Sequence, residues 1–199
     1  MIKSLFHIPA FVYSLENWKE IKAQLIDAIK EYPLEGYDKF NARMHTDYFL
    51  NGARGPYGLE VMKILQPTLD TFRNDLSKVM FQRVLDREEI HLVDIWHQKY
   101  EQYETHRPHT HGETHFACIL YLNFIQGEHP VTRLYAPFSN FLNNDCLTWE
   151  YSDTTEGDII IFPSNILHES PINYNKKPKE IISFNLSLRP FFPAVGSPI

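Results

Sequence analysis

A series of short, apolar runs that begins near residue 90 constrains the fold more than any other feature of the sequence. The runs are rich in β-branched and aromatic residues, and no long helical pattern separates them. Consecutive strands without helices between them pair mainly antiparallel, which favours a sandwich or jelly roll. The six runs are IHLVDIW, HFACILYLNF, VTRLYAP, CLTWEYS, GDIIIFPS and EIISFNLSL.

Residues 1–87 have a different pattern and are expected to form mainly helical support for a jelly-roll core over residues 88–190. Apolar residues recur at helical spacing from Ser14, a candidate N-cap, to Pro33. Residues 37–58 are rich in turn formers and predict a long loop. A second helical stripe is expected after Pro67, with Leu69, Phe72, Leu76, Val79 and Met80 facing the core.

Composition narrows the class of protein. With 199 residues, of which 43% are hydrophobic, the chain can bury the core of a single domain over residues 1–199. The net charge of −6 makes nucleic acid an unexpected partner. No apolar run is long enough to cross a membrane and no signal peptide is evident, so we expect a soluble, cytoplasmic protein. Two cysteines predict neither a disulfide framework nor a zinc cluster, and nothing predicts the oligomeric state.

The segment HRPHTHGETHF, residues 106–116, concentrates four histidines and one glutamate directly before an apolar run. In an extended chain the side chains of His109, His111 and Glu113 point to the same side. His168 follows another apolar run far downstream. Two ligands close together plus one distant histidine is the pattern of a 2-His-1-carboxylate or three-histidine facial metal site. The competing interpretation is a solvated, histidine-rich turn without metal.

A facial site of this kind suits Fe(II). Three protein ligands leave three positions of an octahedral ion open, enough for a bidentate 2-oxo acid and dioxygen. Imidazole and carboxylate are suitable ligands, and no cysteine is required. We assign neither His106 nor His115 to the metal. Arg133 either binds a substrate or lies across the sheet with its charged end in solvent.

Two long blocks share the order and spacing of motifs with a known enzyme family. The first, DIWHQKYEQYETHRPHTHGETHFACILYLN, has a Trp-led strand, a loop ending His-x-His and a strand ending Tyr-Leu. The second, EGDIIIFPSNILHESPINYNKKPKEIISFN, has Gly-Asp, then Phe-Pro-Ser, a histidine and a closing strand that begins with a basic residue. The sequence thereby resembles the 2-oxoglutarate/Fe(II)-dependent oxygenases, in particular the small oxygenases of bacteria and phages and the prolyl hydroxylases.

The resemblance implies a mostly β fold with flanking helices, the double-stranded β-helix, a jelly roll that is also cupin-like. It implies a dioxygenase (hydroxylase) with Fe(II) as metal and 2-oxoglutarate as co-substrate, which releases succinate and CO2. The substrate is a small molecule or a peptide, and a prolyl or other peptidyl side chain is the leading expectation. Two alternatives remain: a cupin-like metal-dependent dioxygenase that does not use 2-oxoglutarate, and a non-catalytic jelly-roll binding module.

The resemblance leaves two possible ligand sets. The family uses His-x-Asp or His-x-Glu, and His111-Gly112-Glu113 has that form. An alignment from Trp96 without gaps instead places His109 at the first ligand position and His111 where the carboxylate stands. Both sets contain His111 and His168. Between His109 and Glu113 we favour Glu113 as the third ligand, because a carboxylate offsets the charge of the ferrous ion.

Co-substrate binding is assigned by the same resemblance. The distal carboxylate of 2-oxoglutarate needs a cation on the strand after the second metal histidine, and Lys179 occupies that place, where the family more often has arginine. Alternation places Asn185 on the same, more polar face as Lys179. Tyr121 matches a tyrosine that contacts 2-oxoglutarate in prolyl hydroxylases, and Tyr100 and Tyr103 are weaker candidates. Lys176 and Lys177 are expected to be solvated.

Overall fold

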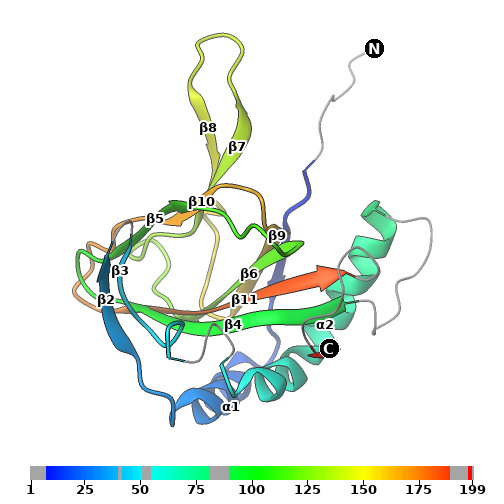
Figure 1. The fold of residues 1–199 in the computed structure, drawn as a ribbon, viewed down its shortest axis with the longest axis vertical. Coiled ribbons are helices and arrows are strands. Elements are labelled where there is room, and N and C mark those ends of the chain that lie inside the picture. The colour runs from blue at the N-terminus through cyan, green and yellow to red at the C-terminus, as the bar shows by residue number, and fades with distance from the viewer. Residues whose placement is uncertain (1–7, 40–41, 51–54, 81–89, 189–196, 199) are drawn as a thin grey trace.

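The structure is a computed structural model that describes residues 8–39, 42–50, 55–80, 90–188 and 197–198. It contains two helices and a large antiparallel sheet (Figure 1). The helices are α1 (Trp18–Ile29) and α2 (Gly58–Met80). The strands are β1 (Phe11–Ser14), β2 (Glu35–Lys39), β3 (Ala42–Thr46), β4 (Ile90–Tyr100), β5 (Thr105–His109), β6 (Phe116–Asn123), β7 (Arg133–Ser139), β8 (Cys146–Trp149), β9 (Asp158–Pro163), β10 (His168–Ser170), β11 (Lys179–Leu188) and β12 (Ser197–Pro198).

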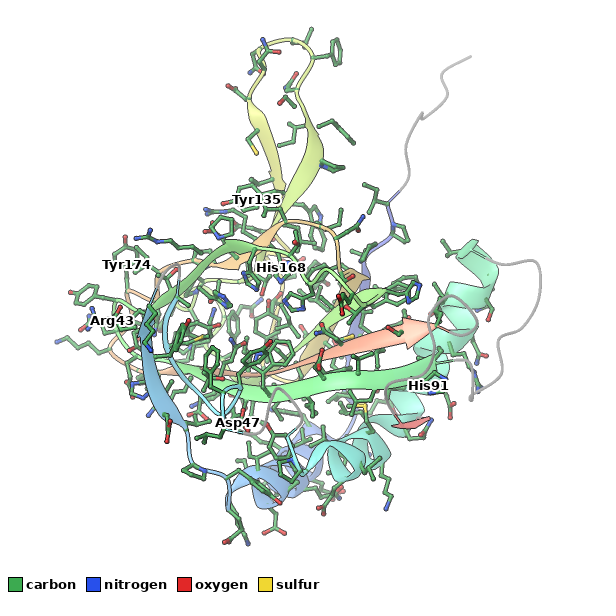
Figure 2. All side chains as sticks on the ribbon, viewed as in Figure 1. Arg43, Asp47, His91, Tyr135, His168 and Tyr174 are labelled. Atoms are coloured by element: carbon green, nitrogen blue, oxygen red, sulfur yellow. The ribbon has the colours of Figure 1, made fainter. Side chains whose placement is uncertain are left out.

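The sheet curls into two facing layers, which confirms the predicted jelly roll. Its strand order is β1-β9-β6-β11-β4-β3-β5-β10-β7-β8, with β2 on β3 and β12 on β4. Figure 1 shows β4, β11 and β6 in one layer and β5 and β10 in the other, while the hairpin of β7 and β8 projects from the body. Figure 2 places His168 between the layers. The interior of the curl is therefore where the distant histidine meets the chain around residue 110.

Two apolar clusters lie on opposite faces of the β4-β11-β6 layer. The outer cluster joins this layer to α1 and α2 and includes Ile182 and Phe184 of β11. The inner cluster fills the curl and includes Ile181, Tyr100 and Tyr121. The alternation along β11 is thus as predicted, because odd-numbered residues face the interior and even-numbered residues face the helices.

The prediction of a long loop over residues 37–58 is wrong in its first half. The β2-β3 hairpin occupies it, and β3 also pairs with β4 and β5, so this part of the chain closes the jelly roll. The alternation was present in the sequence, since Ala42 and Met44 are buried and Arg43 is exposed. The run has only five residues, too few to separate it from a polar loop by pattern alone.

Both helices differ from the predicted ones at their ends. Ser14 does not cap α1. It ends β1, and its hydroxyl donates to Asp158 Oδ1 at 2.6 Å, while Asn17 takes the N-cap position in a left-handed conformation. Helix α2 begins at Gly58, nine residues before the expected Pro67, which lies inside it. Val79, expected in the core, is 48% exposed. Neither of the described helices has the length and apolar character needed to span a membrane.

Candidate metal centre

A β-bulge in β5 brings two histidines to the same side of the sheet. Residue His168 of β10 pairs with His109, and Ser170 pairs with His106, so two steps along β10 correspond to three along β5. The extra residue interrupts the alternation, leaving Arg107 and Pro108 exposed while His106 and His109 turn inward. Their rings stack with centroids 3.7 Å apart and planes 14° apart.

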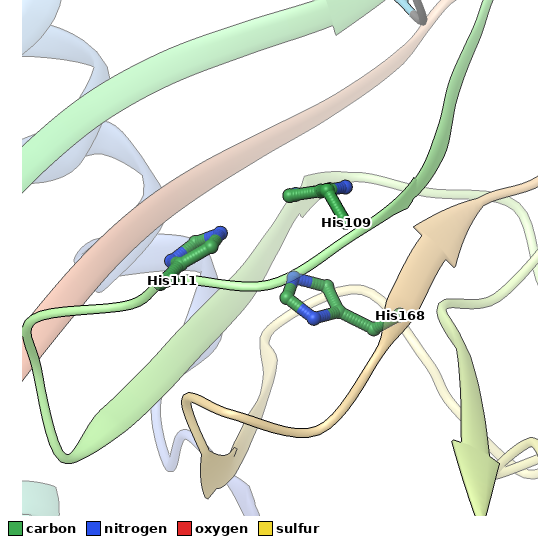
Figure 3. Close-up of side chains that lie close together, drawn as sticks. All are labelled: His109, His111 and His168. Atoms are coloured by element: carbon green, nitrogen blue, oxygen red, sulfur yellow. The ribbon is translucent and has the colours of Figure 1, made fainter.

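Three histidines converge beside this bulge (Figure 3). His109 ends β5, His111 lies in the following loop and His168 begins β10. Each offers one ring nitrogen, and these atoms lie within 4.8 Å of one another. His168 is buried, whereas His109 and His111 are partly exposed. Among the residues that the structure describes, this group has the composition and spacing of a metal centre.

Glu113, favoured above as the third ligand, does not belong to this group. It is exposed and lies in a turn with Gly112, at the mouth of the cavity in front of the histidines. The prediction assumed an extended chain through residue 113, but β5 ends at His109. The structure therefore brings together the alternative set, in which His109 accompanies His111 and His168.

Hydrogen bonds to the ring nitrogens select which nitrogen is free for a metal. In each of the three histidines Nδ1 lies within hydrogen-bonding distance of a carbonyl oxygen, which can only accept, so Nδ1 carries the proton. The Nε2 lone pairs then remain available as ligands, as is usual for metal-binding histidines. The contacts are His109 Nδ1 to Arg107 O (2.8 Å), His111 Nδ1 to Asn185 Oδ1 (2.6 Å) and His168 Nδ1 to Ile166 O (2.9 Å).

The histidines are held in the neutral form that a metal ligand requires. Burial, together with the neighbouring imidazoles, lowers the pKa of His109 to about 4 and that of the stacked His106 to about 3. Burial also lowers the pKa of His111 and, strongly, that of His168. At neutral pH all four rings are therefore uncharged.

Asn185 orients His111, a role that the sequence analysis did not assign to it. Its Nδ2 donates to Asp94 Oδ2 at 3.2 Å, and this contact turns its Oδ1 toward His111. Asn185, which is predicted to bind the co-substrate, lies beside the metal ligands, and the pairing of β4 with β11 brings Asp94 next to it.

We expect Asn185→Ala to lower metal affinity by about 10- to 100-fold, the usual effect of removing a group that orients a ligand. The variant leaves His111 without its acceptor, so the ring is free to rotate and to exchange its protonated nitrogen. Affinity for Ni(II) would be measured by competition with a chromophoric chelator. Asn143→Ala, a change on the exposed hairpin, is the matched control, and equal affinities of the two variants would remove Asn185 from the site.

A narrow interior cavity extends from the three histidines toward Lys179. Tyr100, Thr132 and Ser170 line its far end. Lys179 is fully buried; its Nζ donates to Ser170 Oγ at 2.6 Å and to Pro130 O at 3.1 Å, and it lies 4.8 Å from the centre of the Tyr100 ring. In the described part of the chain no carboxylate pairs with this lysine. Burial lowers its pKa to about 7.

The predicted tyrosines are placed differently from one another. Tyr121 is buried beside the cavity, and its hydroxyl donates to Thr132 Oγ1 at 2.9 Å and accepts from Thr132 N at 3.0 Å. Tyr100 lines the cavity. Tyr103 is 59% exposed and its ring packs near Tyr174, so the structure does not bring it to the site. Arg133 binds Glu150 and Glu169 at the base of the β7-β8 hairpin.

Comparison with known proteins gives matches in structure alone. No protein-family model matches the chain, and no curated protein matches it in sequence. A 2OG-Fe(II) oxygenase family oxidoreductase from Burkholderia pseudomallei superimposes with a TM-score of 0.61 and 11% identity, covering 89% of this chain and 85% of the other. A Pseudomonas putida prolyl-4-hydroxylase superimposes with a TM-score of 0.56 and 14% identity, over 92% and 94% of the two chains.

A third structure adds the ligands that this fold can carry. The epimerase SnoN from nogalamycin biosynthesis, in complex with Fe3+, alpha ketoglutarate and nogalamycin RO, superimposes with a TM-score of 0.61 and 13% identity, over 96% of this chain and 89% of the other. At these identities the comparisons show the fold. The protein has the double-stranded β-helix of the 2OG-Fe(II) oxygenases, as its sequence resemblance implied.

Proposed function

We propose that the protein is an Fe(II)- and 2-oxoglutarate-dependent oxygenase with a metal held by His109, His111 and His168. The observation that carries this proposal is the combination of three convergent histidines with a buried lysine, Lys179, that has no carboxylate partner in the described part of the chain. A metal site alone would not need that cation. A buried charge is costly unless it is paired, so Lys179 favours an anionic ligand in the same interior.

The donor set fits a ferrous ion. His109, His111 and His168 would hold the ion with three neutral imidazoles, which would leave its double charge uncompensated. The two carboxylates of 2-oxoglutarate can supply the missing negative charge, one near the metal and one at Lys179. When bound, the ferrous ion would supply oxidation of a substrate by dioxygen, coupled to conversion of 2-oxoglutarate into succinate and CO2.

The side chains between the histidines and Lys179 bind and orient the co-substrate. Lys179 and the Ser170 hydroxyl hold the distal carboxylate, and the aromatic face of Tyr100 covers the lysine. Without a bound co-substrate, the interior cavity between the histidines and Lys179 has a volume of about 20 Å³, enough for a water molecule. Its lining side chains therefore have to shift when 2-oxoglutarate enters, and the apolar walls then exclude water from the reacting atoms.

Addition of Fe(II) and then 2-oxoglutarate without oxygen tests this proposal. Chelation of the 2-oxo acid at the metal gives a weak visible charge-transfer band, which we expect for the parent protein and for Glu113→Ala. His109→Ala is expected to lose the band and at least tenfold in succinate formation once oxygen is admitted, because His109 supplies one of three ligands.

The opposite pattern, loss in Glu113→Ala and retention in His109→Ala, would restore the carboxylate as third ligand. Metal binding without any response to 2-oxoglutarate would favour the cupin-like alternative. Equal iron loading of the variants, checked by metal analysis, is needed before their rates are compared.

A further inference from the structure

A second, larger cavity lies in front of the three histidines and opens to solvent. It has a volume of about 560 Å³, within the usual range for a small-molecule or side-chain site. Strands β3 and β4 and the loop after β5 surround it, and His109 and His111 form part of its inner wall. A substrate that reaches the metal from solvent would pass through this cavity.

Aromatic rings form a continuous wall from the rim of this cavity to a metal ligand. Tyr37 and Phe49 stack at the rim with centroids 4.5 Å apart and planes 19° apart. Tyr48 meets Phe49 edge-on at 4.9 Å and Trp96 at 5.3 Å, and Trp96 lies 5.6 Å from His111. Phe49 is 56% exposed, so this end of the aromatic wall is accessible to a ligand from solvent.

The charges around the cavity are all of one sign. Among the described residues that line it, the charged ones are Asp94 and Glu113, and no lysine or arginine is present. Asp94 Oδ2 accepts from Asn185, but no cationic side chain in the described segments forms an ion pair with either carboxylate. The cavity therefore presents two carboxylates beside an aromatic wall.

We propose that the substrate carries a cationic nitrogen group, a guanidinium or a primary ammonium, which binds between Asp94, Glu113 and the aromatic wall. This inference rests on the proposed function, since it names the substrate class of the same metal site. Carboxylates attract the cation, and aromatic faces bind it through their quadrupoles while also packing against its alkyl chain. Arginine- or lysine-like side chains combine both properties.

Other substrate classes fit the cavity less well. An anionic substrate would meet two like charges, which costs binding energy. A prolyl side chain, the leading expectation from the resemblance, has no charge to compensate Asp94 and Glu113 when they lose solvent. Burial of unpaired carboxylates is unfavourable, so a neutral substrate would leave them hydrated at the rim.

Calorimetric titration with matched neutral and cationic probes tests the inference. The protein is loaded with Ni(II) and 2-oxoglutarate without oxygen, which separates binding from chemistry. N-acetyl-L-arginine amide is compared with N-acetyl-L-citrulline amide, which has nearly the same shape without the charge. N-acetyl-L-lysine amide and N-acetyl-L-norleucine amide form a second pair. In at least one pair we expect the cationic member to bind at least tenfold more tightly, with a preference that weakens as salt is added.

Two carboxylate variants and two controls test whether Asp94 and Glu113 cause the preference for cationic probes. Glu113→Gln and Asp94→Asn should each reduce the cationic preference severalfold, whereas the exposed Glu16→Gln and Asp153→Asn, which change the net charge equally, should not. Ni(II) affinity is measured for every variant, because Asp94 also fixes Asn185. Glu113 does not form the hydrogen bond to Asn185 that Asp94 accepts, so Glu113→Gln is the decisive variant.

The outcomes separate this inference from the proposed function. Equal binding within both pairs, or no binding at millimolar concentration while Ni(II) and 2-oxoglutarate bind, overturns the cationic substrate and leaves the oxygenase intact. Failure to bind Ni(II) or 2-oxoglutarate overturns the oxygenase itself. In that case the same probes are titrated into the metal-free protein, where a charge preference lost in Glu113→Gln would still identify a cation-binding cavity, and its absence would refute one.

Discussion

His168→Ala is expected to lower the affinity for Fe(II) by well over tenfold, because it removes one of three protein ligands from the centre. His168 is 3% exposed, and the Ile166 carbonyl, 2.9 Å from its Nδ1, fixes the orientation of its ring. His111→Ala should have an effect of the same size. Calorimetry with Fe(II) under anaerobic conditions, or with Ni(II) as a redox-inert substitute, measures both losses.

His45→Ala is the matched control for these variants. His45 lies on β3, is partly exposed and pairs with Glu104 at 3.6 Å, outside the group of three histidines. Its loss should leave metal affinity within twofold of the parent. Thermal unfolding of each metal-free variant separates a lost ligand from a destabilised fold. If His111→Ala and His168→Ala both keep the parent affinity, the metal-site hypothesis is wrong.

The fold could be predicted where the strands are long or strongly apolar. Strands β4, β6, β9 and β11 each contain a run of hydrophobic residues that local pattern alone identifies. Strands β3, β5 and β10 have five, five and three residues, and β5 and β10 carry His109 and His168 toward the interior. Such short strands form because they pair with neighbouring strands, and their own residues do not show which strands those are.

Local sequence pattern also predicts only some of the site residues. The spacing of the histidines predicts His111 and His168 as ligands, and both competing ligand sets contain these two residues. The choice of Glu113 over His109 assumed strict alternation after the strand, but the chain turns at Gly112. Pro108 was an available indication of the bulge in β5, since proline within a strand is typical of bulges and edges.

Contacts between distant elements explain the residues that sequence reasoning missed. Asn185 reaches His111 across 74 positions of the chain, and Asp94 reaches Asn185 across 91. The sequence placed Asn185 on the correct face of its strand, but which side chain it meets depends on the curl of the sheet. The aromatic wall of the outer cavity likewise combines β2, β4 and the segment after β3.

Lys179→Met is expected to weaken 2-oxoglutarate binding by roughly 2–5 kcal/mol, about 30-fold or more in Kd, while metal affinity stays near that of the parent. Methionine fills the same apolar space but cannot pair with the distal carboxylate. Lys179→Arg should retain part of the affinity, because the charge survives although its reach differs. The exposed Lys177→Met is the control and should change little. Titration of each metal-loaded variant without oxygen isolates binding from turnover.

The pH dependence of this binding tests whether Lys179 itself makes the contact. Because burial lowers the pKa of Lys179 to about 7 in the free protein, the side chain is charged below pH 7 and increasingly neutral above it. The bound carboxylate favours the charged form, so binding raises this pKa and takes up a proton at higher pH. Affinity should therefore be flat below pH 7 and fall above it, by up to about tenfold per pH unit. Lys179→Met should lose this slope, and a slope that persists in the variant would assign the titration to another group.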